Sequence, residues 1–182
     1  AKFKLNKNKF LPLTITGSNN LKPINYFENK GSAQCKSAVI FGGMRAKGQT
    51  TIKAKKSRNH TELLCNNLRL PIKIQNKKNF DLIKINGVKK IKKLKYTIPG
   101  DISSSAFFIV LTILNQNSKL IIKNININSS RIGIITILKR MGANISFKNI
   151  KIYKGEKNAD IHIEYVNSLK AINCPSNLNS SA

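Results

Sequence analysis

Helix-like and strand-like patterns alternate along this chain. Four segments repeat their apolar residues every three or four positions, as one face of a helix does. Shorter runs between them alternate apolar and polar residues, which is typical of strands. This alternation predicts an α/β fold with mixed sheets packed on helices. The predicted helices span 32–46, 60–70, 101–115 and 131–142; the predicted strands span 11–16, 21–26, 50–54, 72–75, 80–86, 120–125, 144–148, 151–154 and 160–165, with a basic loop over 89–95.

The order of these elements occurs twice. Ser105-Ala106 follows Ser37-Ala38 by 68 residues, and Ser130-Arg131 follows Ser57-Arg58 by 73 residues. Each copy runs helix, strand, helix and then strands. The chain is therefore expected to contain an internal repeat, in which one structural unit is built twice from different residues.

Three runs of small polar residues stand where helical patterns begin: GSAQCKSA at 31–38, SRNHTE at 57–62 and PGDISSSAFF at 99–108. The start of a helix is an anion site, because its first amides are unpaired and its dipole is positive there. Ser32 is the expected N-cap of the first helix, and Asn59 with Glu62 forms a variant of the capping box. In the second copy, Asp101 would cap its helix but repel a phosphate. The first copy is therefore the better anion site.

Each of these residues also has an ordinary interpretation. Ser32 caps a helix in any case, Arg58 alone is a solvated side chain, and Arg131 is expected to be a surface residue of a first turn. The occurrence of the runs together and in this order favours a phosphate site. Ser32 and Ser57 would supply neutral donors, Arg58 a charge-assisted fork, and Gln34 an amide that both donates and accepts.

The charge balance is strongly basic, with 33 Lys and Arg against 7 Asp and Glu, and a formal net charge of +26. The Lys residues are scattered through every segment, and only 7% of residues are aromatic. Lys, Asn and Ile share A/T-rich codons, so base composition accounts for much of this excess, and no specific nucleic-acid partner is predicted. A basic nucleic-acid-binding domain stays as an alternative, which predicts tight duplex binding with a steep salt dependence.

The remaining residues suggest no metal, cofactor or membrane span. Cys35, Cys65 and Cys174 have no metal-ligand spacing, and Cys35 and Cys65 are expected to be buried thiols. The longest apolar run, 106–114, is too short to cross a bilayer. We expect a cytoplasmic protein. The chain begins with Ala1 rather than Met and ends at Ala182 without a stop pattern, so we also expect an internal fragment.

Four segments resemble one family. SAQCKS is similar to the SAQ-x-KS run of EPSP synthases (3-phosphoshikimate 1-carboxyvinyltransferases), SRNHTE is similar to the SRDHTE of their class II bacterial members, PGDISSSAFF resembles the segment that crosses between their two lobes, and RIGIITILKRMGANI resembles the segment that follows. The resemblance implies the enolpyruvyl transferase fold, with repeated βαβαββ units in two lobes. It places the end of the first lobe at 1–96 and the beginning of the second at 97–182.

The resemblance also implies an activity and its residues. EPSP synthases transfer the enolpyruvyl group of phosphoenolpyruvate to the 5-hydroxyl of shikimate 3-phosphate, a step of chorismate and aromatic amino acid biosynthesis. Gln34 would contact both substrates. No catalytic residue is expected in this chain, because the family's catalytic Asp would lie beyond Ala182, so the chain alone is expected to be inactive. The residues expected to bind shikimate 3-phosphate are Ser32, Ala33 (through its backbone), Gln34, Ser57 and Arg58.

The family requires no cofactor, and the intact protein is expected to be a monomer. A related enolpyruvyl transferase that acts on UDP-N-acetylglucosamine shares the fold and is a second alternative. The SRNHTE run at 57–62 disfavours it, and its cysteine loop is not evident around Cys35 or Cys65.

Overall fold

The structure is a computed structural model that describes residues 2–6, 10–175 and 178. The chain divides into two compact units, the first made of Ala1–Lys55 and Arg69–Ile91 and the second of Lys56–Leu68 and Lys92–Ala182. The α/β class predicted from the alternating pattern is confirmed. The outermost residues of the predicted lobes 1–96 and 97–182 lie outside the described part of the chain.

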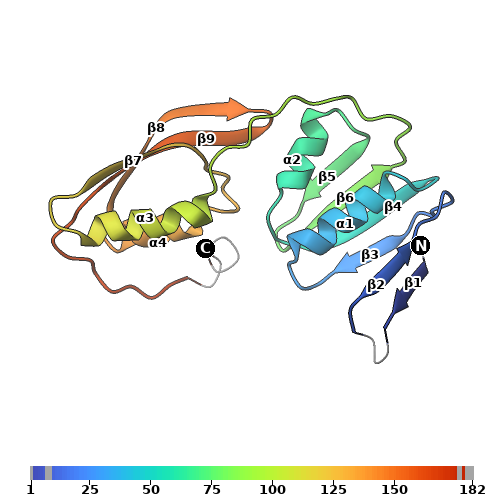
Figure 1. Cartoon of the computed structure of the whole chain (residues 1–182), viewed down its shortest axis with the longest axis horizontal. Helices are drawn as coiled ribbons and strands as arrows, with labels where there is room; N and C mark the ends of the chain where they lie inside the picture. The colour runs from blue at the N-terminus through green and yellow to red at the C-terminus, as the bar shows by residue number, and fades with distance from the viewer. Residues whose placement is uncertain (1, 7–9, 176–177, 179–182) are drawn as a thin grey trace. The chain divides into compact units, whose positions relative to one another are not determined.

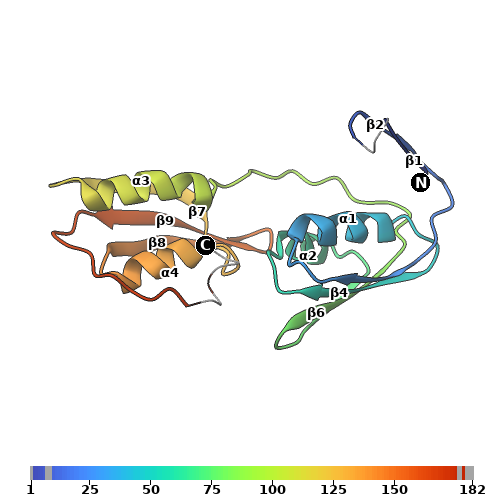
Figure 2. The ribbon, with the colours of Figure 1, turned by 90° about the horizontal axis from the view of Figure 1, so that it is seen from below.

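The first unit is a four-stranded sheet covered on one face by helix α1 (Figures 1 and 2). Strands β3 and β4 pair in parallel, with Glu28 opposite Ala54, and the remaining pairs are antiparallel. A separate hairpin of β1 (Lys2–Leu5) and β2 (Leu13–Thr16) precedes the sheet. The order in the sheet is β3 (Asn25–Glu28), β4 (Gln49–Lys55), β6 (Phe80–Asn86) and β5 (Ile72–Asn76), and α1 spans Ala33–Gly43.

The core of the first unit lies between α1 and the sheet. Ile52 of β4 and Ile83 of β6 point inward because alternate residues of a strand face one side, and both are fully buried with Ile40 of α1. The helix approaches the sheet closely at Gly43, where an added Cβ would lie 2.7 Å from Ile85 Cγ2. On the opposite face, Lys53 Nζ lies 5.5 Å from the ring centroid of Phe27.

The second unit repeats this topology. Its sheet has the order β7, β9, β8, and an isolated parallel bridge joins Gly100 to Ile125 of β7. In the second sheet the spatial order is the Gly100 bridge, β7, β9 and β8, which corresponds to β3, β4, β6 and β5 in the first sheet. The first strand is reduced to a single bridge in this copy. The predicted internal repeat is confirmed. The elements are α2 (His60–Asn67), α3 (Ile102–Leu114), β7 (Lys119–Asn126), α4 (Gly133–Arg140), β8 (Asn144–Tyr153) and β9 (Glu156–Glu164).

The core of the second unit is formed by one face of α3, one face of α4 and the inward residues of the sheet. Ile109, Ile135 and Ile161 are at most 2% exposed. The opposite face of α3 leaves four large apolar side chains exposed: Phe107 (79%), Phe108 (60%), Leu111 (64%) and Leu114 (64%). Such a patch exceeds the single exposed apolar residues that are ordinary on a protein surface. None of the helices in the described residues is long and apolar enough to span a membrane.

Several local predictions were wrong. The strands predicted at 144–148 and 151–154 form the single strand β8, whose register against β9 shifts between Lys148 and Lys151. Asn149 has a φ of 51° and lies within this irregularity. Strand β1 was not predicted. Cys65 is buried as expected, and burial, followed by the charge of Glu62, raises the pKa of its thiol to about 11. Cys35 was expected to be buried but is exposed, because it lies on the open side of α1.

Candidate functional site

The start of α1 has the geometry of an anion site. Ser32 is the N-cap, as predicted, and its Oγ accepts a hydrogen bond from the Cys35 amide at 3.2 Å. The first intrahelical bond runs from the Lys36 amide to the Ser32 carbonyl oxygen at 3.1 Å. The amides of Ala33 and Gln34 therefore stand at the helix start, where backbone N–H groups have no intrahelical acceptor. Gln34 is exposed, and its Oε1 lies 3.5 Å from Ser32 Oγ.

The loop before this helix is fixed by a buried carboxylate. Glu28, the last residue of β3, is 2% exposed and accepts hydrogen bonds from the amides of Lys30 at 2.9 Å and Gly31 at 2.8 Å. Gly31 has a φ of 73°, which favours glycine. Because β3 and β4 are parallel neighbours, the loop to Ser32 and the end of β4 at Lys55 leave the sheet at the same edge.

The other predicted binding residues, Ser57 and Arg58, lie in the segment between β4 and α2, which belongs to the second unit. Arg58 is exposed. The Oγ of Ser57 is buried and has no hydrogen-bond partner within the described part of the chain. A buried hydroxyl without a partner is uncommon in a folded protein and calls for an acceptor or donor that completes it.

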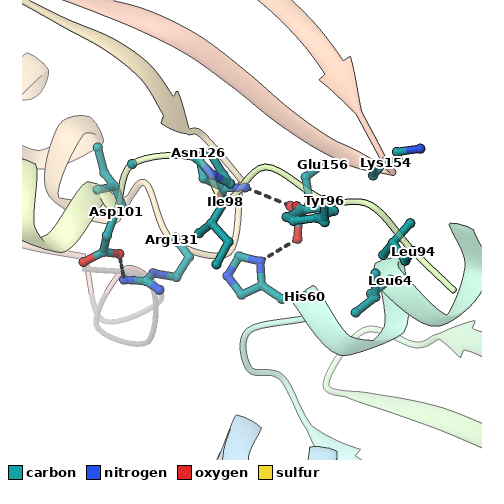
Figure 3. Close-up of a pocket in the computed structure, with 13 residues that line it drawn as sticks. His60, Leu64, Leu94, Tyr96, Ile98, Asp101, Asn126, Arg131, Lys154 and Glu156 are labelled. Carbon is teal, nitrogen blue, oxygen red and sulfur yellow. Dashed lines mark hydrogen bonds and ion pairs between the residues drawn. The ribbon is translucent and has the colours of Figure 1, made fainter.

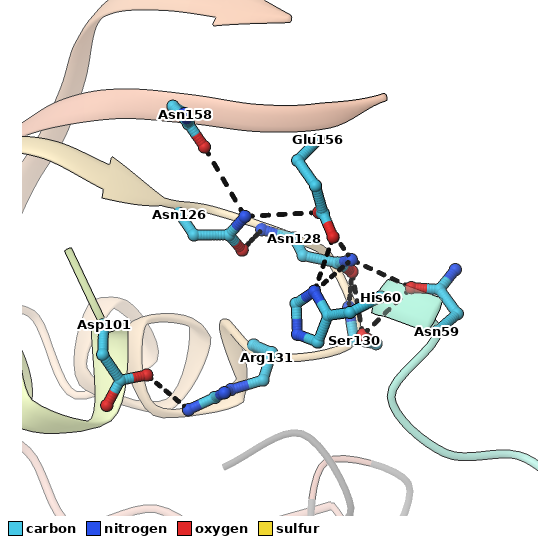
Figure 4. Close-up of polar contacts among 9 residues, drawn as sticks. All are labelled: Asn59, His60, Asp101, Asn126, Asn128, Ser130, Arg131, Glu156 and Asn158. Atoms are coloured by element: carbon cyan, nitrogen blue, oxygen red, sulfur yellow. Dashed lines mark hydrogen bonds and ion pairs between the residues drawn. The ribbon is translucent and has the colours of Figure 1, made fainter. Parts of the chain in front are cut away.

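Directly after Arg58, a group of polar side chains anchors the start of α2 (Figure 4). His60 Nδ1 lies 2.6 Å from Glu156 Oε1, and Asn128 Nδ2 donates to Asn59 Oδ1 at 2.9 Å and to Glu156 Oε2 at 3.0 Å. The members come from α2, from the end of β7 with its following loop, and from the start of β9. This α2 anchor cluster consists of Asn59, His60, Asn126, Asn128, Ser130 and Glu156.

The predicted cap of α2 by the Asn59 side chain is wrong. Asn59 occupies the N-cap position of α2, but its side chain makes no capping hydrogen bond. Its Oδ1 instead accepts from Asn128 Nδ2 and, at 3.4 Å, from Ser130 Oγ. The Asn59 side chain therefore does not cap α2, whereas the Ser32 side chain caps α1.

The centre of the anchor cluster is buried, and its carboxylate is ionised. Glu156 is 5% exposed and Asn128 is 6% exposed. Burial acts to raise the pKa of Glu156, but hydrogen bonds from His60, Asn126 and Asn128, with the charge of His60, outweigh burial and hold the pKa below its ordinary value. The imidazole Nδ1 therefore donates to the carboxylate, and the His60 Nε2 atom on the other side of the ring is buried without a partner in the described residues.

Arg131 was expected to be an ordinary surface residue, and this prediction was wrong. Its Nη2 donates to Asp101 Oδ1 and to Ser103 Oγ, both at 2.6 Å, and its side chain is 19% exposed. Asp101 caps α3 as predicted, accepting from the Ser104 amide at 3.0 Å. Partial burial acts to raise the pKa of Asp101, but the Ser104 hydrogen bonds and the Arg131 charge outweigh it and lower that pKa.

A pocket of about 450 Å³ lies within the second unit, between the α2 anchor cluster and the Asp101–Arg131 pair (Figure 3). Its wall is largely apolar, and no predicted binding residue lines it. Sequence reasoning missed Glu156 and Asn126, because neither lies in a recognisable motif. His60 differs from them, since it lies within the SRNHTE motif. The labelled lining residues are His60, Leu64, Leu94, Tyr96, Ile98, Asp101, Asn126, Arg131, Lys154 and Glu156.

The structure thus groups the predicted binding residues in two places. Ser32, Ala33 and Gln34 lie together at the start of α1 in the first unit, and Ser57 and Arg58 are consecutive in the second unit. No group of His, Cys, Asp or Glu in the described residues has the arrangement to hold a metal ion.

The chain resembles known proteins over most of its length. Residues 1–177 match the family model described as EPSP synthase (3-phosphoshikimate 1-carboxyvinyltransferase). A 3-phosphoshikimate 1-carboxyvinyltransferase from Endomicrobium trichonymphae is 39% identical over 169 residues, which are 92% of this chain and 38% of the relative. A second, from Caldicellulosiruptor bescii, is 42% identical over 153 residues, which are 84% of this chain and 35% of the relative.

Solved structures show the same similarity. An EPSP synthase from Acinetobacter baumannii superimposes with a TM-score of 0.81 at 33% identity, over 98% of this chain and 40% of the other. The enolpyruvyl transferase NikO from Streptomyces tendae shares the fold, with a TM-score of 0.59 at 14% identity. In each case the chain spans well under half of the length of the protein it matches.

Proposed function

Because this chain belongs to the EPSP synthase (3-phosphoshikimate 1-carboxyvinyltransferase) family, we propose that it supplies half of the shikimate 3-phosphate site of an enolpyruvyl transferase. The complete reaction transfers the enolpyruvyl group of phosphoenolpyruvate to the 5-hydroxyl of shikimate 3-phosphate and serves chorismate and aromatic amino acid biosynthesis. The intact transferase is the longer polypeptide of which we propose this chain is a part.

The observation that carries this proposal is the placement of the two motifs on the fold. SAQCKS begins α1 directly after β3, and SRNHTE follows β4, the parallel neighbour of β3. In the first motif the capped helix start offers the Ala33 and Gln34 amides to an anion. In the second, Ser57 offers a buried hydroxyl that lacks a partner in the described residues.

Each predicted residue then has a chemical role. The Arg58 guanidinium donates paired, charge-assisted hydrogen bonds to the shikimate phosphate, and the Ser57 hydroxyl donates a further one. Ser32 and the Ala33 backbone bind shikimate 3-phosphate from the start of α1. Gln34 contacts both shikimate 3-phosphate and phosphoenolpyruvate, since its amide can donate to one group and accept from another. The acid and base that move protons belong to parts of the intact transferase outside this chain.

We further propose that residues 1–96 end the first lobe and 97–182 open the second, with the intact transferase a cytoplasmic monomer. The exposed face of α3 supports a longer protein, because Phe107, Phe108, Leu111 and Leu114 would pack against the helices of further repeats. No cofactor is required for the reaction.

A second transferase, acting on UDP-N-acetylglucosamine, is the competing function. SRNHTE at 57–62 favours shikimate 3-phosphate over the sugar nucleotide. The basic composition alone supports only weak, sequence-blind binding of nucleic acid, since the lysines are spread over the whole chain.

The experiment that tests the proposal is an enolpyruvyl transfer assay of the intact transferase with phosphoenolpyruvate. We expect product with shikimate 3-phosphate and none with UDP-N-acetylglucosamine, and we expect the 182-residue chain alone to be inactive. Product from the sugar nucleotide would replace the first function with the second. Product from the chain alone would show that its catalytic residues lie within these residues. Tight, steeply salt-dependent duplex binding without any transfer activity would favour the nucleic-acid alternative.

A further inference from the structure

We propose that Glu156 and Asn128 are positioning residues for the shikimate phosphate, because they fix the start of α2 and thereby hold Ser57 and Arg58 in place. This inference rests on the proposed function and deepens it. Neither residue lies near SRNHTE in the sequence: Glu156 is 96 residues from His60, and Asn128 is 69 residues from Asn59.

The two residues that follow Arg58 are both held by side-chain contacts. His60 Nδ1 lies 2.6 Å from Glu156 Oε1, and Asn59 Oδ1 accepts from Asn128 Nδ2 at 2.9 Å. Arg58 itself is exposed. A long exposed side chain loses rotamer entropy when it binds, so an anchored backbone next to it reduces the disorder that binding must remove.

The anchor cluster is suited to this role because the Glu156 carboxylate and the Asn128 amide at its centre are buried and hydrogen-bonded. Both carboxylate oxygens of Glu156 accept hydrogen bonds, Oε1 from His60 and Oε2 from Asn126 and Asn128. In a buried setting such bonds are stronger than in water and specify one arrangement. Asn128 Oδ1 also accepts from the Ser130 amide at 2.8 Å, which fixes the orientation of its own amide group.

The anchor cluster also draws the Asn59 oxygen away from the start of α2. An Asn at an N-cap ordinarily accepts from the helix's own amides, but Asn59 uses its Oδ1 for Asn128. The Asn59 side chain therefore does not cap α2, and the neighbouring Ser57 Oγ is buried without a partner in the described residues. Both features are next to Arg58, where the phosphate is proposed to bind.

The β8–β9 turn also approaches α2 closely further along the helix. Gly155, next to Glu156, has a φ of 87°, and a Cβ added there would lie 3.2 Å from the Leu63 carbonyl oxygen. Glu156 therefore contacts the first residue of α2, and the turn at Gly155 passes close to the middle of the helix.

The test compares Glu156→Gln and Asn128→Ala with the control Glu164→Gln in the intact transferase. Glu164 is on the same strand, β9, but its side chain is 45% exposed and pairs with Lys119. We expect the KM for shikimate 3-phosphate to rise about tenfold in the first two variants, the scale of one lost hydrogen bond to a charged group. The KM for phosphoenolpyruvate should stay close to the wild-type value in all three variants. The control Glu164→Gln should also keep the wild-type melting temperature.

A double-mutant cycle with Arg58→Ala separates positioning from general destabilisation. If Glu156 acts through Arg58, Glu156→Gln should change the KM for shikimate 3-phosphate far less when Arg58 is already absent. Unchanged KM values, or equal losses for both substrates with full additivity in the cycle, would overturn the inference while leaving the proposed function intact. A wild-type transferase that forms no product from shikimate 3-phosphate would overturn the proposed function first, and this inference with it.

Discussion

The Glu28 carboxylate accepts a hydrogen bond from the Gly31 amide at 2.8 Å, across the loop that joins β3 to α1. The other carboxylate oxygen accepts from the Lys30 amide at 2.9 Å. A buried side chain at the end of a strand thus sets the path of the backbone that leads to Ser32. In the second unit, side chains of the α2 anchor cluster do the same for the backbone that follows Arg58, so both motifs are adjacent to a buried carboxylate.

Glu28→Ala should lower stability and weaken substrate binding together. The substitution leaves two backbone amides without acceptors in a partly buried loop, which costs about 1–3 kcal/mol of unfolding free energy. The KM for shikimate 3-phosphate should rise as well, because Ser32 loses its support. Urea unfolding and steady-state kinetics of the intact transferase measure both effects, with the half-exposed Glu164→Ala as control. An unchanged unfolding midpoint would show that the loop does not depend on Glu28.

Arg58→Ala should weaken shikimate 3-phosphate binding by about 1.5–3 kcal/mol, the scale of a hydrogen bond between charged groups. Because Arg58 is exposed, the melting temperature should change little. Titration calorimetry of the intact transferase measures the affinity. The control is Lys55→Ala, which removes a nearby exposed positive charge outside the proposed site. Equal affinity in wild type and Arg58→Ala would remove Arg58 from the site.

Gln34→Ala should lower activity without unfolding the protein. The Gln34 side chain is exposed, and its one described hydrogen bond, with Ser32 Oγ, is long at 3.5 Å. Its loss should therefore leave the melting temperature near that of wild type while turnover falls. Cys35→Ala, at the next exposed position of α1, is the matched control. A collapse of the melting temperature in Gln34→Ala would assign Gln34 a structural role instead.

Much of the fold could be predicted because hydrophobic periodicity and helix-capping residues are recognisable in short segments of sequence. The strand predicted at 80–86 has the observed bounds, the Ser32 and Asp101 caps are present, and the repeat order is the same in both copies. The enolpyruvyl transferase fold that the motifs implied is also confirmed. These features depend on residues a few positions apart, where side-chain spacing and backbone preference agree.

The errors came from interactions between distant residues. Asn59 was predicted to cap α2, but Asn128 competes for its oxygen from 69 residues away. Arg131 was predicted to be a solvated residue, but in the structure it donates to Asp101, 30 residues earlier in the sequence. The break predicted between strands 144–148 and 151–154 is absent, and the Asn149 side chain within it donates to Asp160 on the neighbouring strand at 2.8 Å. A local pattern does not contain such partners.

Gly155→Ala should destabilise the second unit more than Gly142→Ala. Both glycines have a positive φ, 87° and 97°, which strains any residue with a Cβ. The added Cβ at 155 would also lie 3.2 Å from the Leu63 carbonyl oxygen, whereas nothing lies within 4 Å at 142. We expect a loss of about 1 kcal/mol for the strain in both variants, and a further loss in Gly155→Ala alone. Equal unfolding midpoints for Gly155→Ala and Gly142→Ala would show that the β8–β9 turn has room for a Cβ beside α2.

Glu156 should make stability depend on pH in the acid range. Its folded-state pKa is lower than the ordinary carboxyl value of 4.5, since hydrogen bonds from His60, Asn126 and Asn128 outweigh the opposing effect of burial. The unfolded chain therefore binds the proton more readily than the folded one, so the stabilisation is fully present above the unfolded pKa. It is lost as the pH falls through the depressed folded pKa. Denaturant unfolding of wild type and Glu156→Gln, from neutral pH to below 4.5, measures this contribution. The stability difference between the two proteins should narrow as the pH falls, and a difference that stays constant would show that Glu156 is not held ionised by the anchor cluster.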